Sequence, residues 1–262
     1  VNTFWHSNTI FLLKRGHRWL PQIEEILLKN EIPSDLKYLS VIESDLQNKV
    51  SPSQAVGFWQ LLKPTAKEFG LEVNNEVDER YHPLKSTEAA CKYLKRSLRK
   101  FGNWTNAAAS YNAGMRGIDR AMSRQGVNSY YDLLLTEETS RYVFRAIAIK
   151  LIFENPGRYG FNIPDEQLYD AEPLRELKVT SSINNLREYA FNQGINYKIL
   201  KRHNPWLRRN SLTVRKGRSY LISVPVAKSA DSKKKNKPIV QDTVVINKDT
   251  TEFSDEDFRP VK

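Results

Sequence analysis

The spacing of the apolar residues is the feature that most constrains how this chain can fold. Through most of residues 10–155 they recur at every third or fourth position, and clean alternation is rare. This period places apolar side chains on one face of a helix, so this part of the chain is predicted to be helical. Of the 262 residues, 40% are hydrophobic and 11% are aromatic, which is enough to bury a sizeable core. We therefore expect one or two globular domains rather than a disordered chain.

Capping and stop residues divide the helical part into segments. Ser86 is expected to cap one helix, and Gly70, Gly102 and Gly114 each to end one. A polar loop is predicted over residues 47–55. The helices are expected near residues 19–27, 33–46, 65–69, 86–101, 106–112 and 138–154.

The pattern changes in the last third of the chain. Residues 177–179 and 220–224 alternate as strands do, and helical patterns at 185–192 and 197–202 lie between them. The sequence therefore predicts a β-α-α-β module in which two short helices connect the two strands.

The predicted fold class is mainly α, with a small α+β module. We expect a helical domain at residues 1–163, with its core at 33–160, and the β-α-α-β domain at residues 172–228. Residues 229–262 are expected to form a flexible tail, in which 239–246 could add one strand.

Basic residues dominate the charge, which sums to +11. Between Glu188 and Asp231 there are nine Lys or Arg residues and no acidic one. Such a stretch attracts polyanions, which include nucleic acid, anionic lipid and anionic cell-wall polymer. No nucleic-acid motif accompanies it, so a solvated basic face is favoured and no nucleic-acid partner is expected.

Several other classes of protein are disfavoured by composition. No stretch approaches the ~18 uncharged apolar residues of a membrane-spanning helix. Cys91 is the single cysteine and the four histidines are scattered, so we expect no disulfide framework, no metal site and no cofactor. The start at Val1, without a Met or an apolar leader, is interpreted as a processed chain whose targeting segment has been removed. Membrane association through that segment stays open.

Glu43 is the most unusual charged residue of the helical part. The helical period places it on the apolar stripe of Leu36, Leu39 and Leu46, whereas Asp45 lies on the other side. A carboxylate that faces an apolar wall loses hydration, which raises its pKa toward the range of a general acid. The alternative is an inward Glu that pairs with a buried Arg or Lys, and spacing alone favours that alternative.

Four short motifs occur in order around this carboxylate. They are Glu43-Ser44, Gly57-Phe58-Trp59-Gln60, the Ala-x-x-Tyr-Asn-x-Gly block that ends at Gly114, and Glu138-Thr139-x-x-Tyr142. Over about residues 33–160 the chain resembles the lysozyme-like (SLT) catalytic domain of the lytic transglycosylases, most closely their membrane-bound, murein-cleaving members. One such motif is weak evidence, but four in order at domain-scale spacing make chance an unattractive explanation.

The resemblance implies an enzyme that cleaves peptidoglycan with one carboxyl group. The bond is the β-1,4 link between N-acetylmuramic acid and N-acetylglucosamine. By resemblance, Glu43 first protonates the glycosidic oxygen and then accepts the proton of the muramoyl C6 hydroxyl, which closes a 1,6-anhydro ring. The nucleophile is tethered to the electrophile, so no second carboxylate has to activate water.

The resemblance also implies roles for other residues of these motifs. Gln60 and Ser51 correspond to residues that contact the sugar, and Trp59 either walls the cleft or belongs to the core. Ser44 either contacts substrate or only tethers its helix. Three further residues are implied to orient the acid, contact substrate or face Glu43 across the cleft, and they are Tyr111, Asn112 and Tyr142.

The second module resembles a degenerate lysin motif (LysM), a β-α-α-β unit that recognises N-acetylglucosamine chains. The resemblance rests on Val179, Leu186, Ala190, Leu200, Asn204-Pro205, Gly217 and the closing residues 221–225. The usual Gly-Asp-Thr after the first strand is replaced by Ser182-Ile183-Asn184-Asn185, in the loop that lines the family's sugar groove. Two roles stay open, namely glycan binding and a packing module that buttresses the catalytic domain.

The sequence therefore predicts a bacterial lytic transglycosylase of the periplasm or cell envelope. Its expected partners are peptidoglycan glycan strands, and we expect a monomer. The alternatives are a non-catalytic peptidoglycan-binding scaffold, a hydrolytic muramidase of the same fold and, from the basic stretch alone, a polyanion-binding protein.

Overall fold

The structure is a computed structural model that describes residues 6–226. The chain is mainly helical with one small sheet, which confirms the predicted fold class. The expected tail and the strand proposed at 239–246 lie outside the described residues. The helices of the first part are α1 (His6–Lys29), α2 (Lys37–Ser44), α3 (Lys63–Glu68), α4 (Pro83–Phe101), α5 (Trp104–Ala113), α6 (Met115–Gln125) and α7 (Glu137–Glu154). Short 3-10 turns at Ser34–Leu36, Glu79–Tyr81, Tyr130–Asp132, Pro156–Tyr159 and Asp165–Gln167 connect or extend them.

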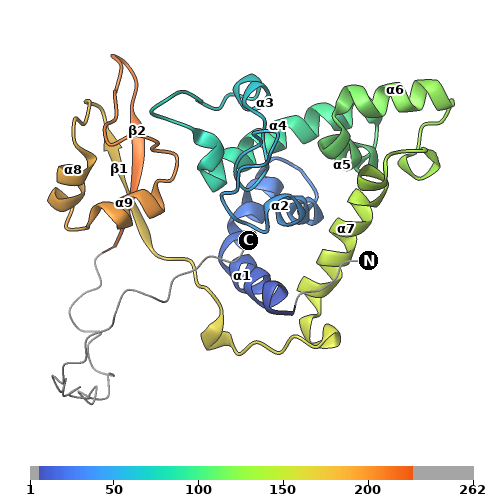
Figure 1. The fold of residues 1–262 in the computed structure, drawn as a ribbon, viewed down its shortest axis with the longest axis horizontal. Coiled ribbons are helices and arrows are strands. Elements are labelled where there is room, and N and C mark those ends of the chain that lie inside the picture. The colour runs from blue at the N-terminus through green and yellow to red at the C-terminus, as the bar shows by residue number, and fades with distance from the viewer. Residues whose placement is uncertain (1–5, 227–262) are drawn as a thin grey trace, which may run out of the picture. The chain divides into compact units, whose positions relative to one another are not determined.

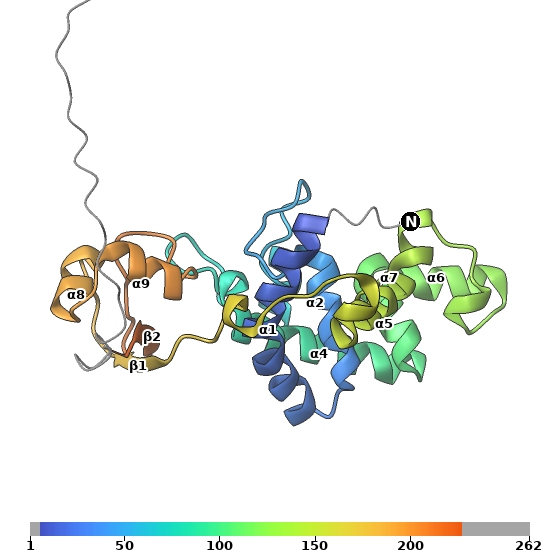
Figure 2. The same ribbon diagram turned by 90° about the horizontal axis from the view of Figure 1, so that it is seen from below.

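The helical part is organised around the short helix α5. It packs against α4, α6 and α7, while α2 packs against α1 and α7 (Figures 1 and 2). The middle of α5 consists of small buried residues, Ala107 to Ser110, which let neighbouring helices approach closely. The surrounding core is formed by larger residues such as Ile23, Leu27, Trp59, Leu94 and Ile118.

Two helix boundaries differ clearly from those that the sequence predicts, namely the start of α4 and the end of α2. α4 begins at Pro83 rather than Ser86, because His82 is the residue whose side chain accepts the Lys85 N–H. Ser86 is instead buried inside the helix and donates to the Pro83 carbonyl. α2 ends at Ser44, because Asp45 and Leu46 both have positive φ, 54° and 55°.

Helix α6 is an element that the sequence analysis missed. Gly114 was expected only to end a helix, but its φ of 74° and ψ of 148° turn the chain directly into α6. The glycine therefore serves two helices, because this conformation is open to a residue without a Cβ.

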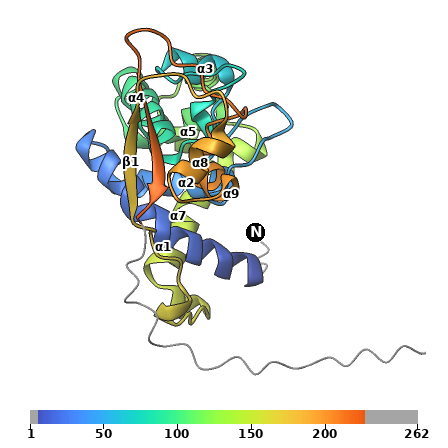
Figure 3. The same cartoon turned by 90° about the vertical axis from the view of Figure 1, so that its left-hand side faces the viewer.

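The last part forms the predicted β-α-α-β module. Strands β1 (Leu174–Val179) and β2 (Tyr220–Pro225) pair antiparallel, with Leu177 opposite Ile222. Helices α8 (Leu186–Asn192) and α9 (Tyr197–His203) connect them and pack beside the sheet (Figures 1 and 3). Leu186, Leu200 and Trp206 are buried in a separate core with the inward residues of β2.

Among residues 6–226, no helix is both long and apolar enough to cross a membrane.

Candidate active site

Glu43 lies in the last turn of α2 and lines a cleft of about 950 Å³. α5 and α7 contribute to the walls of this cleft, together with residues 51–61, which we call the cleft loop. Glu43 is only partly exposed, although Ser44 beside it is fully buried. The helix thus carries its one cleft carboxylate at a boundary between core and cavity.

Two tyrosines lie beside this carboxylate. The Tyr142 hydroxyl donates to Glu43 Oε1 at 2.6 Å, from the second turn of α7. The Tyr111 hydroxyl donates to the carbonyl of Trp59 at 2.8 Å, and its ring lines the cleft. Burial raises the pKa of both phenols well above the ordinary value, and the charge of Glu43 adds to this, so both stay protonated donors.

The environment of Glu43 brings its pKa to about 7. Burial is the largest cause and raises it, and the negative charge of Glu138 raises it further. The hydrogen bond from Tyr142 and the positive charge of Arg145 lower it. A carboxyl with this pKa is half protonated at neutral pH, whereas at the ordinary value of 4.5 only roughly one in three hundred is protonated.

The alternative of a Glu paired with a buried cation is not what the structure shows. Within the described chain, no Lys, Arg or His lies within ion-pair distance of Glu43. Arg145 acts on its pKa only through space, and its guanidinium contacts the Ile42 carbonyl at 3.4 Å. Glu43 is therefore held by a neutral donor and stays open to the cleft.

Asn112 links the cleft side of α5 to the start of α7. Its Nδ2 donates to Glu138 Oε1 at 3.1 Å, and its Oδ1 accepts the Thr139 hydroxyl at 2.8 Å. Glu138 lies in the first turn of α7, where the helix dipole favours a negative charge. The amide orientation is thereby fixed, and the side chain lines the cleft.

The cleft loop carries the two other polar residues expected at the site. Gln60 has a φ of 43° and donates through Nε2 to the carbonyls of Gly57 and Lys49, at 2.9 and 3.2 Å. The Ser51 hydroxyl lies 2.9 Å from that of Ser53 and accepts the Ala55 N–H. Both Gln60 and Ser51 line the cleft, together with Glu43, Tyr111, Asn112 and Tyr142.

Ser44 is the one proposed substrate-binding residue that the structure places outside the cleft. It is 2% exposed, and its hydroxyl donates to the carbonyls of Ser40 and Phe58. It therefore tethers α2 to the cleft loop and has no free surface for a sugar. Trp59 likewise belongs to the core, because it is fully buried and donates to Thr87 Oγ1 at 2.8 Å.

Arg145 is a cleft residue that the sequence analysis did not single out. It follows Tyr142 by three positions on α7, so the two side chains share a helix face. The three-residue spacing from Tyr142 was the sequence feature that could have identified Arg145 as a cleft residue. Arg96 and Arg116 also line the cleft, from α4 and α6, and no motif marked them.

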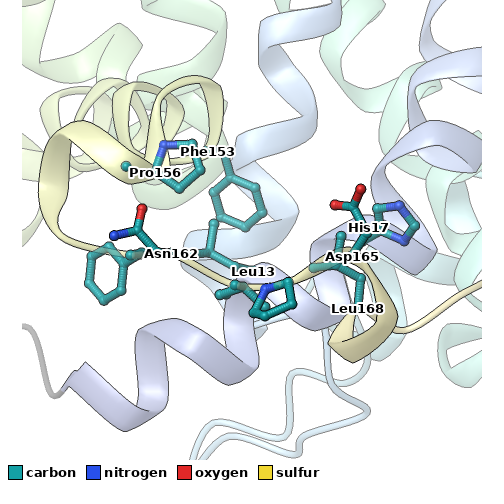
Figure 4. Close-up of a pocket in the computed structure, with 11 residues that line it drawn as sticks. Leu13, His17, Phe153, Pro156, Asn162, Asp165 and Leu168 are labelled. Atoms are coloured by element: carbon teal, nitrogen blue, oxygen red, sulfur yellow. The ribbon is translucent and has the colours of Figure 1, made fainter.

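A second cavity lies away from Glu43. It has a volume of about 650 Å³ and is lined by Leu13 and His17 of α1, Phe153 of α7 and parts of residues 156–168 (Figure 4). Its lining is largely apolar, and His17 and Asp165 lie together at one end of the labelled set (Figure 4). None of the residues of the four motifs lines it.

Comparison with protein families assigns both parts of the chain. Residues 22–133 match the transglycosylase SLT domain, and residues 175–228 match the soluble lytic transglycosylase C-terminal LysM-like domain. The chain therefore carries an SLT-type transglycosylase domain followed by a LysM-like domain. The cleft loop, Glu43, Tyr111 and Asn112 lie within the first match, and Tyr142 lies beyond it.

Individual relatives are consistent with these matches. Over 190 residues the chain is 28% identical to the membrane-bound lytic murein transglycosylase D of Escherichia coli (strain K12), which covers 70% of this chain and 41% of the relative. Over 133 residues it is 30% identical to a putative tributyltin chloride resistance protein of Alteromonas sp. (strain M-1), which covers 49% of this chain and 64% of that protein. The chain thus spans less than two thirds of the length of these curated relatives.

Proposed function

We propose that this protein is a peptidoglycan lytic transglycosylase of the bacterial cell envelope. The observation that carries the proposal is Glu43, a cleft carboxyl with a pKa of about 7 that is held by Tyr142 and has no cationic partner within ion-pair distance in residues 6–226. The SLT-domain match and the homology to lytic murein transglycosylase D support the same class of enzyme.

The proposed substrate is the β-1,4 bond between N-acetylmuramic acid and N-acetylglucosamine. In the first step, protonated Glu43 gives its proton to the glycosidic oxygen, and the bond to the muramoyl C1 breaks. Glu43 is then a carboxylate and accepts the proton of the muramoyl C6 hydroxyl, whose oxygen bonds to C1. The products are a free N-acetylglucosamine end and a 1,6-anhydromuramoyl end, and no water is consumed.

The residues around Glu43 have complementary roles in this proposal. Tyr142 stabilises the carboxylate between the two proton transfers, because its hydroxyl stays a donor. Gln60, Ser51 and Asn112 present side-chain polar atoms at the cleft, where they would position the two sugars. Tyr111 fixes the cleft loop through the Trp59 carbonyl.

A hydrolytic muramidase is the second candidate, and Glu138 is the observation that favours it. Glu138 lines the same cleft and raises the pKa of Glu43, so it is close enough to interact with it electrostatically. An inverting hydrolase needs a second carboxylate that activates water. The contact of Glu138 with the Asn112 amide favours a positioning role instead.

The test is product analysis with two matched Glu-to-Gln variants. Purified peptidoglycan is digested with the wild type, Glu43→Gln and Glu138→Gln, and the muropeptides are identified by mass spectrometry. We expect 1,6-anhydro ends from the wild type and from Glu138→Gln and none from Glu43→Gln. Reducing ends that disappear in Glu138→Gln would assign hydrolysis. Sugar binding without any cleavage by the wild type would assign a binding scaffold.

A further inference from the structure

A short segment of the SLT-type domain is built into the core of the LysM-like domain. This connecting segment comprises residues 76–81. Val77 is 1% exposed in that core, pairs with Leu207 in an antiparallel bridge, and is followed by Asp78, whose N–H donates to the Trp206 carbonyl at 2.9 Å. The Arg208 N–H donates in turn to the Glu76 carbonyl at 2.7 Å. The segment thus extends the backbone hydrogen bonding of the LysM-like domain.

Side chains on both sides of Val77 add to this attachment. The Glu76 carboxylate accepts the Thr213 N–H at 3.0 Å and the Ser211 hydroxyl at 3.2 Å. The Arg208 guanidinium lies 3.9 Å from the centre of the Tyr81 ring. Such stacked and charge-assisted contacts fix the segment more firmly than apolar packing alone.

The same segment supports the cleft loop through a buried ion pair. Arg80 and Asp78 are 8% and 7% exposed, and the guanidinium grips the carboxylate with two hydrogen bonds, of 3.0 and 2.8 Å. The remaining donor, Nη1, reaches the carbonyls of Gln54 and Leu61, at 3.1 and 3.2 Å. One buried side chain therefore hydrogen-bonds the main chain on both sides of residues 55–60, the part of the cleft loop that carries Gln60.

The backbone of Arg80 also approaches this loop closely. A Cβ at Gly57 would lie 2.0 Å from the Arg80 carbonyl oxygen, so only glycine allows the contact. Gly57 in turn provides the carbonyl that Gln60 Nε2 contacts at 2.9 Å. A shift of the connecting segment is consequently transmitted to Gln60 by atoms in direct contact.

We propose that the LysM-like domain positions the cleft loop for catalysis, with Val77 and Arg80 as the positioning residues that connect them. This inference rests on the proposed function. Of the two roles left open by the sequence, glycan binding and a module that buttresses the catalytic domain, it favours the second. The degenerate loop at 182–185 agrees with it, because Ile183 pairs with Leu212 and the Val214 N–H donates to the Ser182 hydroxyl. Glu76 contacts the neighbouring Thr213 from the SLT-type side.

The first test compares amide hydrogen exchange in two Val-to-Ala variants. Val77→Ala and Val224→Ala remove the same atoms from the same core, but Val224 lies on β2 opposite Arg175. The reporters are the amides of Val56, Gly57 and Leu61, whose hydrogen bonds hold the cleft loop. We expect their exchange to accelerate on the order of tenfold in Val77→Ala and to stay as in the wild type in Val224→Ala. Equal exchange in the two variants would overturn the proposal.

A second pair avoids the core in case Val77→Ala does not fold. Arg208→Ala removes the guanidinium that covers the Tyr81 ring, and Arg209→Ala changes its exposed neighbour. Faster exchange of the cleft loop in the first variant alone supports the proposal. Identical exchange in both overturns it.

Kinetics on a short soluble glycan distinguish positioning from partial unfolding, because partial unfolding does not change KM. The substrate is a tetrasaccharide of alternating N-acetylglucosamine and N-acetylmuramic acid. We expect Val77→Ala to raise KM several-fold with kcat within about twofold, because Gln60 is displaced while Glu43 is not. A variant that is merely less folded would lose kcat at unchanged KM, and that result would count against positioning. Val77→Ile, which keeps a branched apolar side chain at this position, should have the KM of the wild type.

The two proposals fail in different ways. If the wild type produces no 1,6-anhydro end from this glycan, the proposed function is wrong, while hydrogen exchange still decides whether the LysM-like domain holds the cleft loop. If the wild type is active but the cleft loop exchanges alike in every variant, only the positioning role is wrong.

Discussion

The hydroxyl of Tyr142 donates to Glu43 Oε1 across 2.6 Å, although 99 positions separate the two residues in the chain. Among the groups that act on the carboxyl, this donor is the strongest one that favours the charged form, against burial, which favours the neutral form. The balance places the pKa of Glu43 at about 7, where one carboxyl can both give and take a proton.

Replacing Tyr142 with Phe should therefore raise the pKa of Glu43. Free enzyme with protonated Glu43 is the active form, so kcat/KM of the wild type should fall about tenfold per pH unit above pH 7. In Tyr142→Phe the carboxylate loses a charge-assisted hydrogen bond, which is worth about 1.5–3 kcal/mol. The alkaline limb of the profile, where kcat/KM falls, should therefore move to higher pH by about one to two units. The pH dependence of kcat/KM measures the shift, and a limb that stays in place would exclude Glu43 as the titrating acid.

The two charged neighbours of Glu43 should move the same limb in opposite directions. Glu138→Gln removes a negative charge that raises the pKa of Glu43, so the limb should move to lower pH. Arg145→Met removes a positive charge that lowers this pKa, so the limb should move to higher pH. Each shift should be a few tenths of a unit, since partly solvated charge pairs are worth about 0.2–1 kcal/mol. Shifts of the same sign would contradict the electrostatic account.

The inward position of Glu43 could be predicted from sequence, because the helical period alone places it among Leu36 and Leu39. Its partner could not be found in this way, because nothing local in the chain links position 43 to position 142. That pairing came from a resemblance to a family, and the spacing of single motifs does not contain it. Ser44 shows a different limit of motif reasoning. It is next to the acid in a motif and was expected to bind substrate, yet its hydroxyl is buried and donates to two main-chain carbonyls.

The attachment of the LysM-like domain was also beyond sequence reasoning. The strands and helices of the module follow from local alternation and period, and the structure has them within a few residues of the expected bounds. Val77, by contrast, lies in a stretch without a strong period, and its burial depends on a domain that begins about a hundred residues later. Periodicity reports which face of an element is buried but not which distant segment covers it.

Glu43 should cost the folded protein stability at alkaline pH. Its folded pKa of about 7 lies above the ordinary value of 4.5, so the folded state binds a proton that the unfolded state has released. The carboxyl is mostly neutral in both states below pH 4.5, so the penalty develops as pH rises from about 4.5 to 7 and stays constant at higher pH. Glu43→Gln keeps an acceptor for Tyr142 and should be more stable than the wild type by roughly 3 kcal/mol at pH 9.

The measurement is urea denaturation of both proteins across this pH range. The two should have equal stability near pH 4, apart from a constant offset caused by the substitution itself. A difference that does not grow between pH 4 and pH 9 would show that the pKa of Glu43 is not raised in the folded state.

Cys91 is expected to be chemically inert in the folded protein. It is fully buried on α4, and burial raises the pKa of its thiol to about 12. The thiolate is the reactive form, so a thiol-specific reagent at pH 8 should label the chain only as it unfolds. Labelling that follows the unfolding transition in urea would agree, and rapid labelling without denaturant would contradict this burial.

Gly57, the single glycine of the cleft loop, should not tolerate a larger residue. An alanine there would place its Cβ 2.0 Å from the Arg80 carbonyl oxygen, at a φ of +84°. Gly102 is a matched control, because its φ is +77° and no atom lies within 4 Å of the added Cβ. Gly102→Ala should lower the free energy of unfolding by about 1–2 kcal/mol, because only the left-handed backbone is unfavourable. Gly57→Ala adds a clash with main chain and should lower it by roughly 3–5 kcal/mol. Urea denaturation of the two variants tests this, and equal costs would mean that the contact between Gly57 and Arg80 can relax.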